Sequence, residues 1–287
     1  MTKSEGYTEE PVSVVPGSVM SAEHEGRANF DSALTPLTLP FTGERIVPGQ
    51  VDEPLFRAHE ARYVFAGSFV KDKAVLDVAC GTGIGTHYLL KAAALSCLGL
   101  DIDRPAIDYA RAAYSGCQFA QCDATNLCVP DSSIDVVVSF ETIEHLRDQL
   151  KFLSECNRVL RPGGVLVCST PNRTMSRWAR ENIYHVHEFT VAELTRALET
   201  FFVDVRLFGQ KNTNHLLYAG RGLLSRALHG LQLMGLAKSL LRWESPPLTE
   251  GTEFGEIPTD SDYEIQPYHA ARLMQPRYVI AVARRSP

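Results

Sequence analysis

Residues 74–85, with the sequence AVLDVACGTGIG, constrain the fold of this chain more than any other segment. Their first half is apolar apart from Asp77, which predicts a buried strand of a parallel sheet. The glycines that follow predict a tight turn, and the helix expected after the turn has free N–H groups in its first turn. A strand, a glycine turn and a helix in this order are typical of a site for a nucleotide-like ligand.

The spacing of the glycines indicates which nucleotide is disfavoured. A dinucleotide-binding turn has the pattern G-x-G-x-x-G, whereas here Thr86 stands where the last glycine would be. This spacing disfavours NAD. Asp101 ends the next apolar run, SCLGLD, about 20 residues further on, where a carboxylate accepts hydrogen bonds from both ribose hydroxyls. The turn and the acid together fit any adenosine ligand.

Strand and helix signals alternate from Lys73 onward, which predicts a parallel sheet wrapped by helices. We expect strands at residues 74–79, 96–101, 117–121, 134–140, 164–169 and 203–208. We expect helices at residues 85–95, 104–114, 147–160 and 191–200, the last with a capping box formed by Thr190 and Glu193. Beyond residue 210 the alternation stops, an apolar helical segment covers residues 223–243, and short strands are expected near 261–265 and 277–285.

Four motifs follow one another along the chain: LDVACGTG, GLDID, CDATNLCVPDSSIDVVVSFETIEHL and RVLRPGGVLVCSTPN. They resemble the motifs of class I S-adenosylmethionine (SAM) methyltransferases, and the resemblance extends from Lys73 to about Gln210. It implies an α/β, Rossmann-like fold with a seven-stranded, mostly parallel sheet and helices on both faces. The last strand of this fold runs antiparallel between the two strands before it. The resemblance also implies that the cofactor is SAM.

The same resemblance implies a role for individual residues at the cofactor site. These are Asp77, Ala79, Gly81 and Gly83 for the methionine end, Asp101 with Ile102 for the ribose, Asp123 and Ala124 for the adenine edge, and Phe140 and Glu141 for the floor of the site. Ala79 takes the position of the family's frequent first glycine. We expect Gly81 and Gly83 to let the backbone approach the ligand closely.

The composition of the chain limits the kinds of binding partner and the cellular location that we expect. The formal net charge of −6 argues against a nucleic-acid-binding surface, because phosphate binding needs clustered Lys and Arg. No apolar run reaches the roughly 20 residues that span a bilayer, and the N-terminus lacks the apolar region of a signal peptide, so we expect a cytoplasmic protein with no integral membrane segment. All seven cysteines fall between Cys80 and Cys168 without a zinc spacing; we expect reduced core residues. A homodimer is possible.

The chain divides into one core with appendages. Residues 1–35 are expected to form a flexible tail, 36–72 an N-terminal clamp or lid, 73–210 the SAM-binding core, 211–276 a cap insertion over the substrate and 277–287 the final core strand. The clamp contains TGER, which resembles the leader of methyltransferases that act on sugars or glycosylated metabolites. Its Arg45 either pairs with an acid or binds substrate.

Histidines near the ends of two expected strands are the candidates for chemistry. Glu144 and His145 follow the fourth strand, where they either cap the next helix or contact the acceptor, His145 as a base and Glu144 as a substrate ligand. In the segment NIYHVHEF, an extended backbone would project His185 and His187 together, with Glu188 on the other side. That pair predicts a base, a sugar-binding rim or a weak metal site, with His185 the stronger catalytic candidate and His187 a substrate contact. We assign no metal ligand from the sequence.

These features favour a SAM-dependent methyltransferase that methylates a hydroxyl of a saccharide or a glycosylated metabolite. The segments TGERIVPG and YHVHEF and the C-terminal pattern resemble bacterial polysaccharide methyltransferases of the methylglucose lipopolysaccharide type. One alternative is an N- or O-methyltransferase of a small natural product or a quinone-like ring. The other is a SAM-binding partner subunit without turnover.

Overall fold

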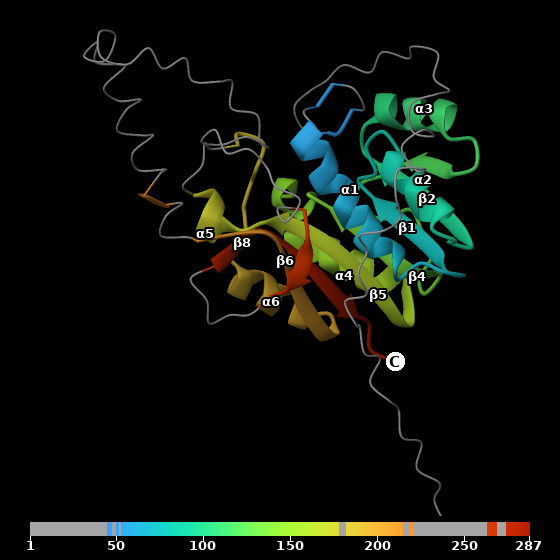
Figure 1. Cartoon of the computed structure of the whole chain (residues 1–287). Helices are drawn as coiled ribbons and strands as arrows, with labels where there is room; N and C mark the ends of the chain where they lie inside the picture. Colours follow the sequence, from blue (N-terminus) through green and yellow to red (C-terminus); the bar gives the residue numbers. More distant parts are fainter. Residues whose placement is uncertain are drawn as a thin grey trace, which may run out of the picture. The chain divides into compact units, whose positions relative to one another are not determined.

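A computed structural model describes residues 45–47, 50–51, 53–177, 182–214, 219–220, 263–268 and 274–287. Eight strands form one sheet in the order β3-β2-β1-β4-β5-β8-β6-β7 (Figure 1). Their bounds are β1 Ala74–Val78, β2 Ser96–Asp101, β3 Gln118–Gln121, β4 Ile134–Phe140, β5 Leu160–Pro171, β6 Val203–Asn214, β7 Ile265–Pro267 and β8 Met274–Arg284. Strands β1 to β5 pair in parallel, and β8 enters antiparallel between β5 and β6.

Helices cover both faces of the sheet. Their bounds are α1 Glu53–Gly67, α2 Ile84–Lys91, α3 Arg104–Ala113, α4 Gln149–Val159, α5 Arg173–Ser176 and α6 Val191–Glu199, with a 3-10 turn η2 at Ile143–His145. Successive strand residues point to opposite faces. In β1, Val75 accordingly packs in the core under α1 and α2, whereas Leu76 packs in the core under α4 and α6. The doubly wound architecture follows from strands that are apolar on both sides.

The predicted fold class is confirmed, and so is the antiparallel last strand between its two predecessors. The predicted count of seven strands is wrong, because the short strand β7 adds to the sheet beyond β6. The capping box of Thr190 and Glu193 is present at the start of α6. All seven cysteines are free, four of them buried and Cys128 exposed.

The ends of the expected cap insertion belong to the sheet. Strand β6 continues to Asn214 and β8 begins at Met274, so that residues 212–214 pair with residues 274–276. Antiparallel neighbours extend each other for as long as their backbones stay aligned, a property that the sequence pattern does not reveal. The apolar segment 223–243 and the expected tail 1–35 lie outside the described residues.

In the part of the chain that the structure describes, no helix is long and apolar enough to cross a membrane.

Candidate active site

The glycine turn leaves the carboxyl end of β1 and enters α2. Ala79, Gly81 and Gly83 all have left-handed backbone conformations, with φ of 59°, 54° and 80°. A Cβ built on Gly81 would meet nothing nearer than the Cβ of Arg45, at 3.9 Å. The backbone at Gly81 therefore borders open space, as expected for a turn that a ligand approaches closely.

Gly83 is a glycine for a different reason. A Cβ at this position would lie 2.7 Å from the Cβ of Ala110 and 2.8 Å from the ring of Phe119. Real side chains do not approach one another so closely, so Gly83 lets the turn pack against α3 and β3. The space beside Gly83 is thus taken by the protein core, and its φ of 80° also favours glycine, while the close approach of a ligand at this position stays a prediction.

Asp101 ties together the two loops at this edge of the sheet. Its Oδ2 accepts a hydrogen bond from the backbone N–H of Gly81, at 2.8 Å, and its Oδ1 accepts one from the backbone N–H of Asp103, also at 2.8 Å. The carboxylate is half-buried and lies at the end of β2. It is thus fixed in place before any ligand binds, and each oxygen keeps a second lone pair for a ribose hydroxyl.

Arg45 and Ile46, from the segment expected to form a clamp, contact the loops at this edge. Arg45 Nη1 donates to Asp103 Oδ2 at 2.5 Å, and Thr82 Oγ1 donates to the backbone oxygen of Ile46 at 3.1 Å. Asp103 also caps α3, so the contact links the clamp to the helix start. Of the two sequence-based alternatives for Arg45, the structure supplies the acid partner, and a substrate contact stays a prediction.

Asp77 is fully buried at the end of β1. Its Oδ2 accepts a hydrogen bond from Thr86 Oγ1 at 2.7 Å, and the hydroxyl of Tyr63 on α1 donates to the same carboxylate at 3.3 and 3.4 Å. Burial raises the pKa of Asp77 to about 7, although these hydrogen bonds oppose the shift. The ring of Tyr63 packs edge to face on Phe140, with centroids 5.0 Å apart. Tyr63 lies in the segment expected to form a clamp or lid, but it was not among the predicted site residues.

The expected adenosine contacts follow the ends of the neighbouring strands. Ile102 is 67% exposed directly after β2. Asp123 is exposed after β3 and accepts hydrogen bonds from the backbone N–H and the hydroxyl of Thr125, and Ala124 is half-buried beside it. The carboxyl ends of parallel strands meet at one edge, so the structure brings these residues to the edge that carries Asp101.

Arg62 of α1 occupies the centre of the edge formed by β4, β5 and β8. It is fully buried, its Nη1 lies 3.2 Å from Glu141 Oε1, and its guanidinium lies 4.4 Å from the ring centroid of Tyr278. Arg62 Nε donates to Gln210 Oε1 at 2.8 Å, and Glu141 accepts a hydrogen bond from Ser169 Oγ at 2.6 Å. Sequence reasoning missed Arg62, because its partners come from distant parts of the chain.

Glu144 is buried next to this ion pair. Its Oε2 accepts a hydrogen bond from Thr170 Oγ1 at 2.9 Å, whereas its Oε1 has no hydrogen-bond partner within the described residues. Burial, and after it the charge of Glu141, raises the pKa of Glu144 well above its usual range. A buried acid oxygen that has no hydrogen-bond partner among the described residues is a costly feature.

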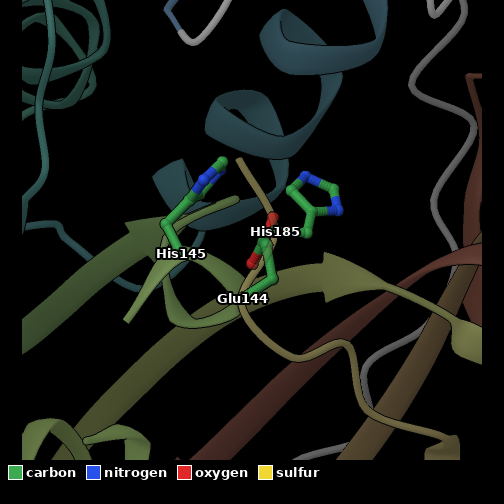
Figure 2. A group of neighbouring side chains, drawn as sticks. All are labelled: Glu144, His145 and His185. Carbon is green, nitrogen blue, oxygen red and sulfur yellow. The ribbon is translucent and has the colours of Figure 1, made fainter. Parts of the chain in front are cut away.

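His145 and His185 come from separate segments and meet beside Glu144. Their rings are nearly perpendicular, with centroids 4.8 Å apart, and Figure 2 shows Glu144 between them. His145 Nδ1 donates to the backbone oxygen of Tyr184 at 3.2 Å, and His185 Nδ1 donates to Glu188 Oε1 at 2.5 Å. The two residues that the sequence nominated as catalytic therefore share one site.

The expected pairing of His185 with His187 is wrong. His187 is exposed and its ring packs edge to face on Phe189, whereas His185 turns toward His145. Glu188, expected on the other side, instead holds His185. The chain turns at Ile183, so the segment is not the extended strand that the prediction assumed. Although burial raises the pKa of Glu188, hydrogen bonds from His185 and Ser176 outweigh it and hold this pKa below the usual range.

Comparison with known proteins identifies the family. Residues 76–168 match the model of the methyltransferase domain family. A Mycolicibacterium smegmatis protein described as a "probable S-adenosylmethionine-dependent methyltransferase" is 44% identical over 179 residues, which cover 61% of this chain and 69% of the relative. The chain belongs to the SAM-dependent methyltransferases. A more distant relative, phthiotriol/phenolphthiotriol dimycocerosates methyltransferase 1 of Mycobacterium ulcerans, is 33% identical over 175 residues, 56% of this chain and 65% of its own length.

A solved structure shares the fold of this methyltransferase. The SAM-dependent methyltransferase from Archaeoglobus fulgidus matches with a TM-score of 0.52 and 18% identity, covering 82% of this chain and 95% of the other. The open space at Gly81 and the fixed carboxylate of Asp101 fit an adenosine ligand. When bound, SAM supplies a methyl group activated by its positively charged sulfur.

Proposed function

We propose that this methyltransferase methylates the oxygen of a hydroxyl on a saccharide or glycosylated metabolite. The observation that carries the proposal is the meeting of His145 and His185 beside Glu144, at the edge of the sheet where ligands of this fold bind. An alcohol is a poor nucleophile at neutral pH, so an enzyme that methylates one must activate it. Two adjacent imidazoles are suited to that task.

His185 is the better oriented of the two histidines. Its Nδ1–H donates to Glu188, and the side-chain amide of Asn182 donates to Nε2 at 2.9 Å. These bonds select the tautomer with an unprotonated Nε2. In the most direct route, the acceptor hydroxyl displaces the Asn182 amide from this nitrogen, which then accepts the hydroxyl proton as the methyl group reaches the oxygen, and the Glu188 carboxylate stabilises the imidazolium that forms. We assign His145 the positioning of the acceptor hydroxyl.

The acceptor class has separate support. The resemblance of TGERIVPG and YHVHEF to polysaccharide methyltransferases favours a sugar hydroxyl. The Mycobacterium ulcerans relative is named for phthiotriol and phenolphthiotriol dimycocerosates, and a triol also offers hydroxyl groups. Both lines of support agree on an oxygen acceptor rather than an amine.

A natural product or quinone-like ring is the second candidate, and one observation favours it. Ile183, Tyr184 and Val186 are exposed apolar residues of the loop that carries His185. Exposed apolar side chains beside a polar site suit an acceptor with an apolar body.

Transfer of an isotope-labelled methyl group from SAM tests both candidates. Purified enzyme is incubated with saccharides, glycosides, phenolic rings and matched amines, and the methylated atom is located by NMR. We expect an O-methyl group on a saccharide or glycoside, and none with the variant in which both His145 and His185 are alanine. Transfer only to phenols would favour the second candidate. Transfer only to amines would overturn the proposal of an oxygen acceptor.

A further inference from the structure

We propose that Glu144, His145 and His185 bind one divalent transition-metal cation such as Mn²⁺ or Co²⁺. Each of the three offers one ligand atom, and these atoms all lie within 4.8 Å of one another (Figure 2). Nitrogen and oxygen ligands stand about 2.1 Å from such a cation, which places them roughly 3 to 4 Å apart. Small rotations of the three side chains bring them to this spacing.

The unsatisfied oxygen of Glu144 is an independent sign of a cation. Oε1 is buried and no described residue donates a hydrogen bond to it, while Oε2 is held by Thr170. The neighbouring carboxylate of Glu141 already has the buried cation Arg62. Glu144 thus adds a second acid beside the Glu141–Arg62 ion pair. A cation at Oε1 would supply the missing contact and would stabilise the ionised carboxylate.

The surroundings of both imidazoles match those of metal ligands. A ligating histidine almost always donates its other ring N–H to a carboxylate or to a backbone carbonyl, which fixes the ring and the tautomer. His185 donates from Nδ1 to Glu188, and His145 donates from Nδ1 to the backbone oxygen of Tyr184. Both rings therefore present Nε2 as the unprotonated nitrogen. At His185 the cation takes the place of the Asn182 amide.

The ligand set indicates the kind of cation. Two imidazoles and one carboxylate on one side of an ion suit first-row transition cations, whereas Mg²⁺ and Ca²⁺ prefer oxygen ligands. Three protein ligands leave coordination positions open. If the proposed function is right, an acceptor hydroxyl takes one of these positions, and the cation lowers its pKa so that its proton passes to solvent water instead of to an imidazole.

Titration with Co²⁺ tests the site without reference to activity. Protein stripped of metal by a chelator is titrated with Co²⁺, followed by visible absorption and by calorimetry, and the titration is repeated with Mn²⁺ by calorimetry. We expect one equivalent to bind, and the affinity to fall at least about 100-fold in Glu144→Gln, His145→Ala and His185→Ala. Glu188→Gln, which removes the support of His185, should weaken binding by about 10- to 100-fold.

His187→Ala is the matched control, because this exposed histidine lies outside the cluster, and it should bind Co²⁺ like the wild type. Glu144→Gln keeps the size of the side chain and an oxygen for Thr170, so its folding is checked by thermal unfolding. Absence of Co²⁺ and Mn²⁺ binding at about 1 mM, the weak end of affinities for protein calcium sites, or binding that survives all three ligand variants, would overturn the proposal.

Failure of the metal site can be distinguished from failure of the proposed function. If hydroxyl methylation continues in the presence of the chelator, with no metal bound, the cation has no role in the reaction and the proposed methyl transfer is still supported. If the chain binds Co²⁺ one to one but methylates only amines, the proposed hydroxyl acceptor is rejected and the metal site is supported.

Discussion

The two halves of the proposed site, one for the cofactor and one for the acceptor, differ in how far the protein satisfies its own polar groups. In the cofactor half, at the ends of β1 and β2, Asp77 and Asp101 each accept hydrogen bonds from the protein. In the acceptor half, at the ends of β4 and β5, Glu144 Oε1 and both terminal nitrogens of Arg62 lack hydrogen-bond partners. Only His87 Nδ1 among the described residues shares this condition elsewhere.

This contrast has a physical meaning. Hydrogen bonds that are made without the ligand indicate a preformed site. We therefore expect the cofactor half to bind SAM without rearranging its own hydrogen bonds. Buried polar atoms without hydrogen-bond partners among the described residues cost free energy, so we expect a bound group to complete the acceptor half. The cofactor half is therefore expected to govern SAM binding, and the acceptor half is expected to govern turnover.

Removal of His185 should have the largest effect and sharpen this contrast. We expect His185→Ala to lower turnover by about 10²- to 10⁴-fold, because the hydroxyl loses the group that activates it, while SAM affinity stays unchanged. Turnover is measured with the identified acceptor, and SAM affinity by calorimetry. His187→Ala is the comparison variant and should lower turnover far less, because this ring packs on Phe189 and not beside His145. A parallel loss of SAM affinity in His185→Ala would show that the halves are not separable.

Asp77 makes the cofactor half depend on pH. Its native pKa of about 7 lies above the unfolded value of about 3.9, so the native state binds more protons between these values. The free energy of unfolding should therefore fall as pH rises from about 4 to about 7, by up to about 4 kcal/mol from this group. Asp77→Asn should flatten that part of the profile. Denaturant unfolding of both proteins without SAM measures it, and identical profiles would contradict the prediction.

Substitution of the two glycines of the turn should have different effects. Gly83→Ala forces a Cβ into Ala110 and Phe119, and we expect it to lower the free energy of unfolding by about 2–3 kcal/mol. Gly81→Ala has space for its Cβ, so it should cost only about 1 kcal/mol from the left-handed backbone and should mainly weaken SAM binding. Equal destabilisation by both changes would mean that Gly81 also serves packing.

Ala79 should give the smallest effect, and of opposite sign. It holds a left-handed conformation that glycine adopts without strain. Because glycine also loses more entropy on folding, Ala79→Gly should stabilise the protein by only about 0.5 kcal/mol. Thermal unfolding measures the difference, and a destabilised variant would contradict it.

The halves also differ in how well the sequence predicts them. Asp77, Gly81 and Asp101 belong to local patterns in which strand, turn and acid follow at fixed spacing, so the sequence locates the cofactor half. Gly83 was predicted from the same pattern, but its packing against Ala110 and Phe119 was not, because these neighbours come from α3 and β3. Local sequence patterns thus predict which positions belong to the site better than they predict the contacts that each residue makes.

The acceptor half depends on contacts between distant segments. Arg62 bonds to Gln210, which is 148 residues away, and no local periodicity connects the two. His145 and His185 were each proposed from the sequence, but their meeting requires the turn at Ile183, which the assumption of an extended strand excluded. The contact between His185 and Glu188 is local, since the acid lies three residues after the histidine.

Binding of SAM to the wild type and to Asp101→Ala, followed by calorimetry, is the most direct test of the central claim that the end of β2 holds the ribose of SAM. We predict that the substitution weakens SAM binding by about 1–3 kcal/mol, since charged hydrogen bonds to the ribose are lost. Asp101→Asn, which keeps one oxygen for the backbone N–H of Gly81 or Asp103, controls for loosening of the turn. Unchanged SAM affinity in Asp101→Ala, or tighter binding of NAD than of S-adenosylhomocysteine by the wild type, would contradict the claim.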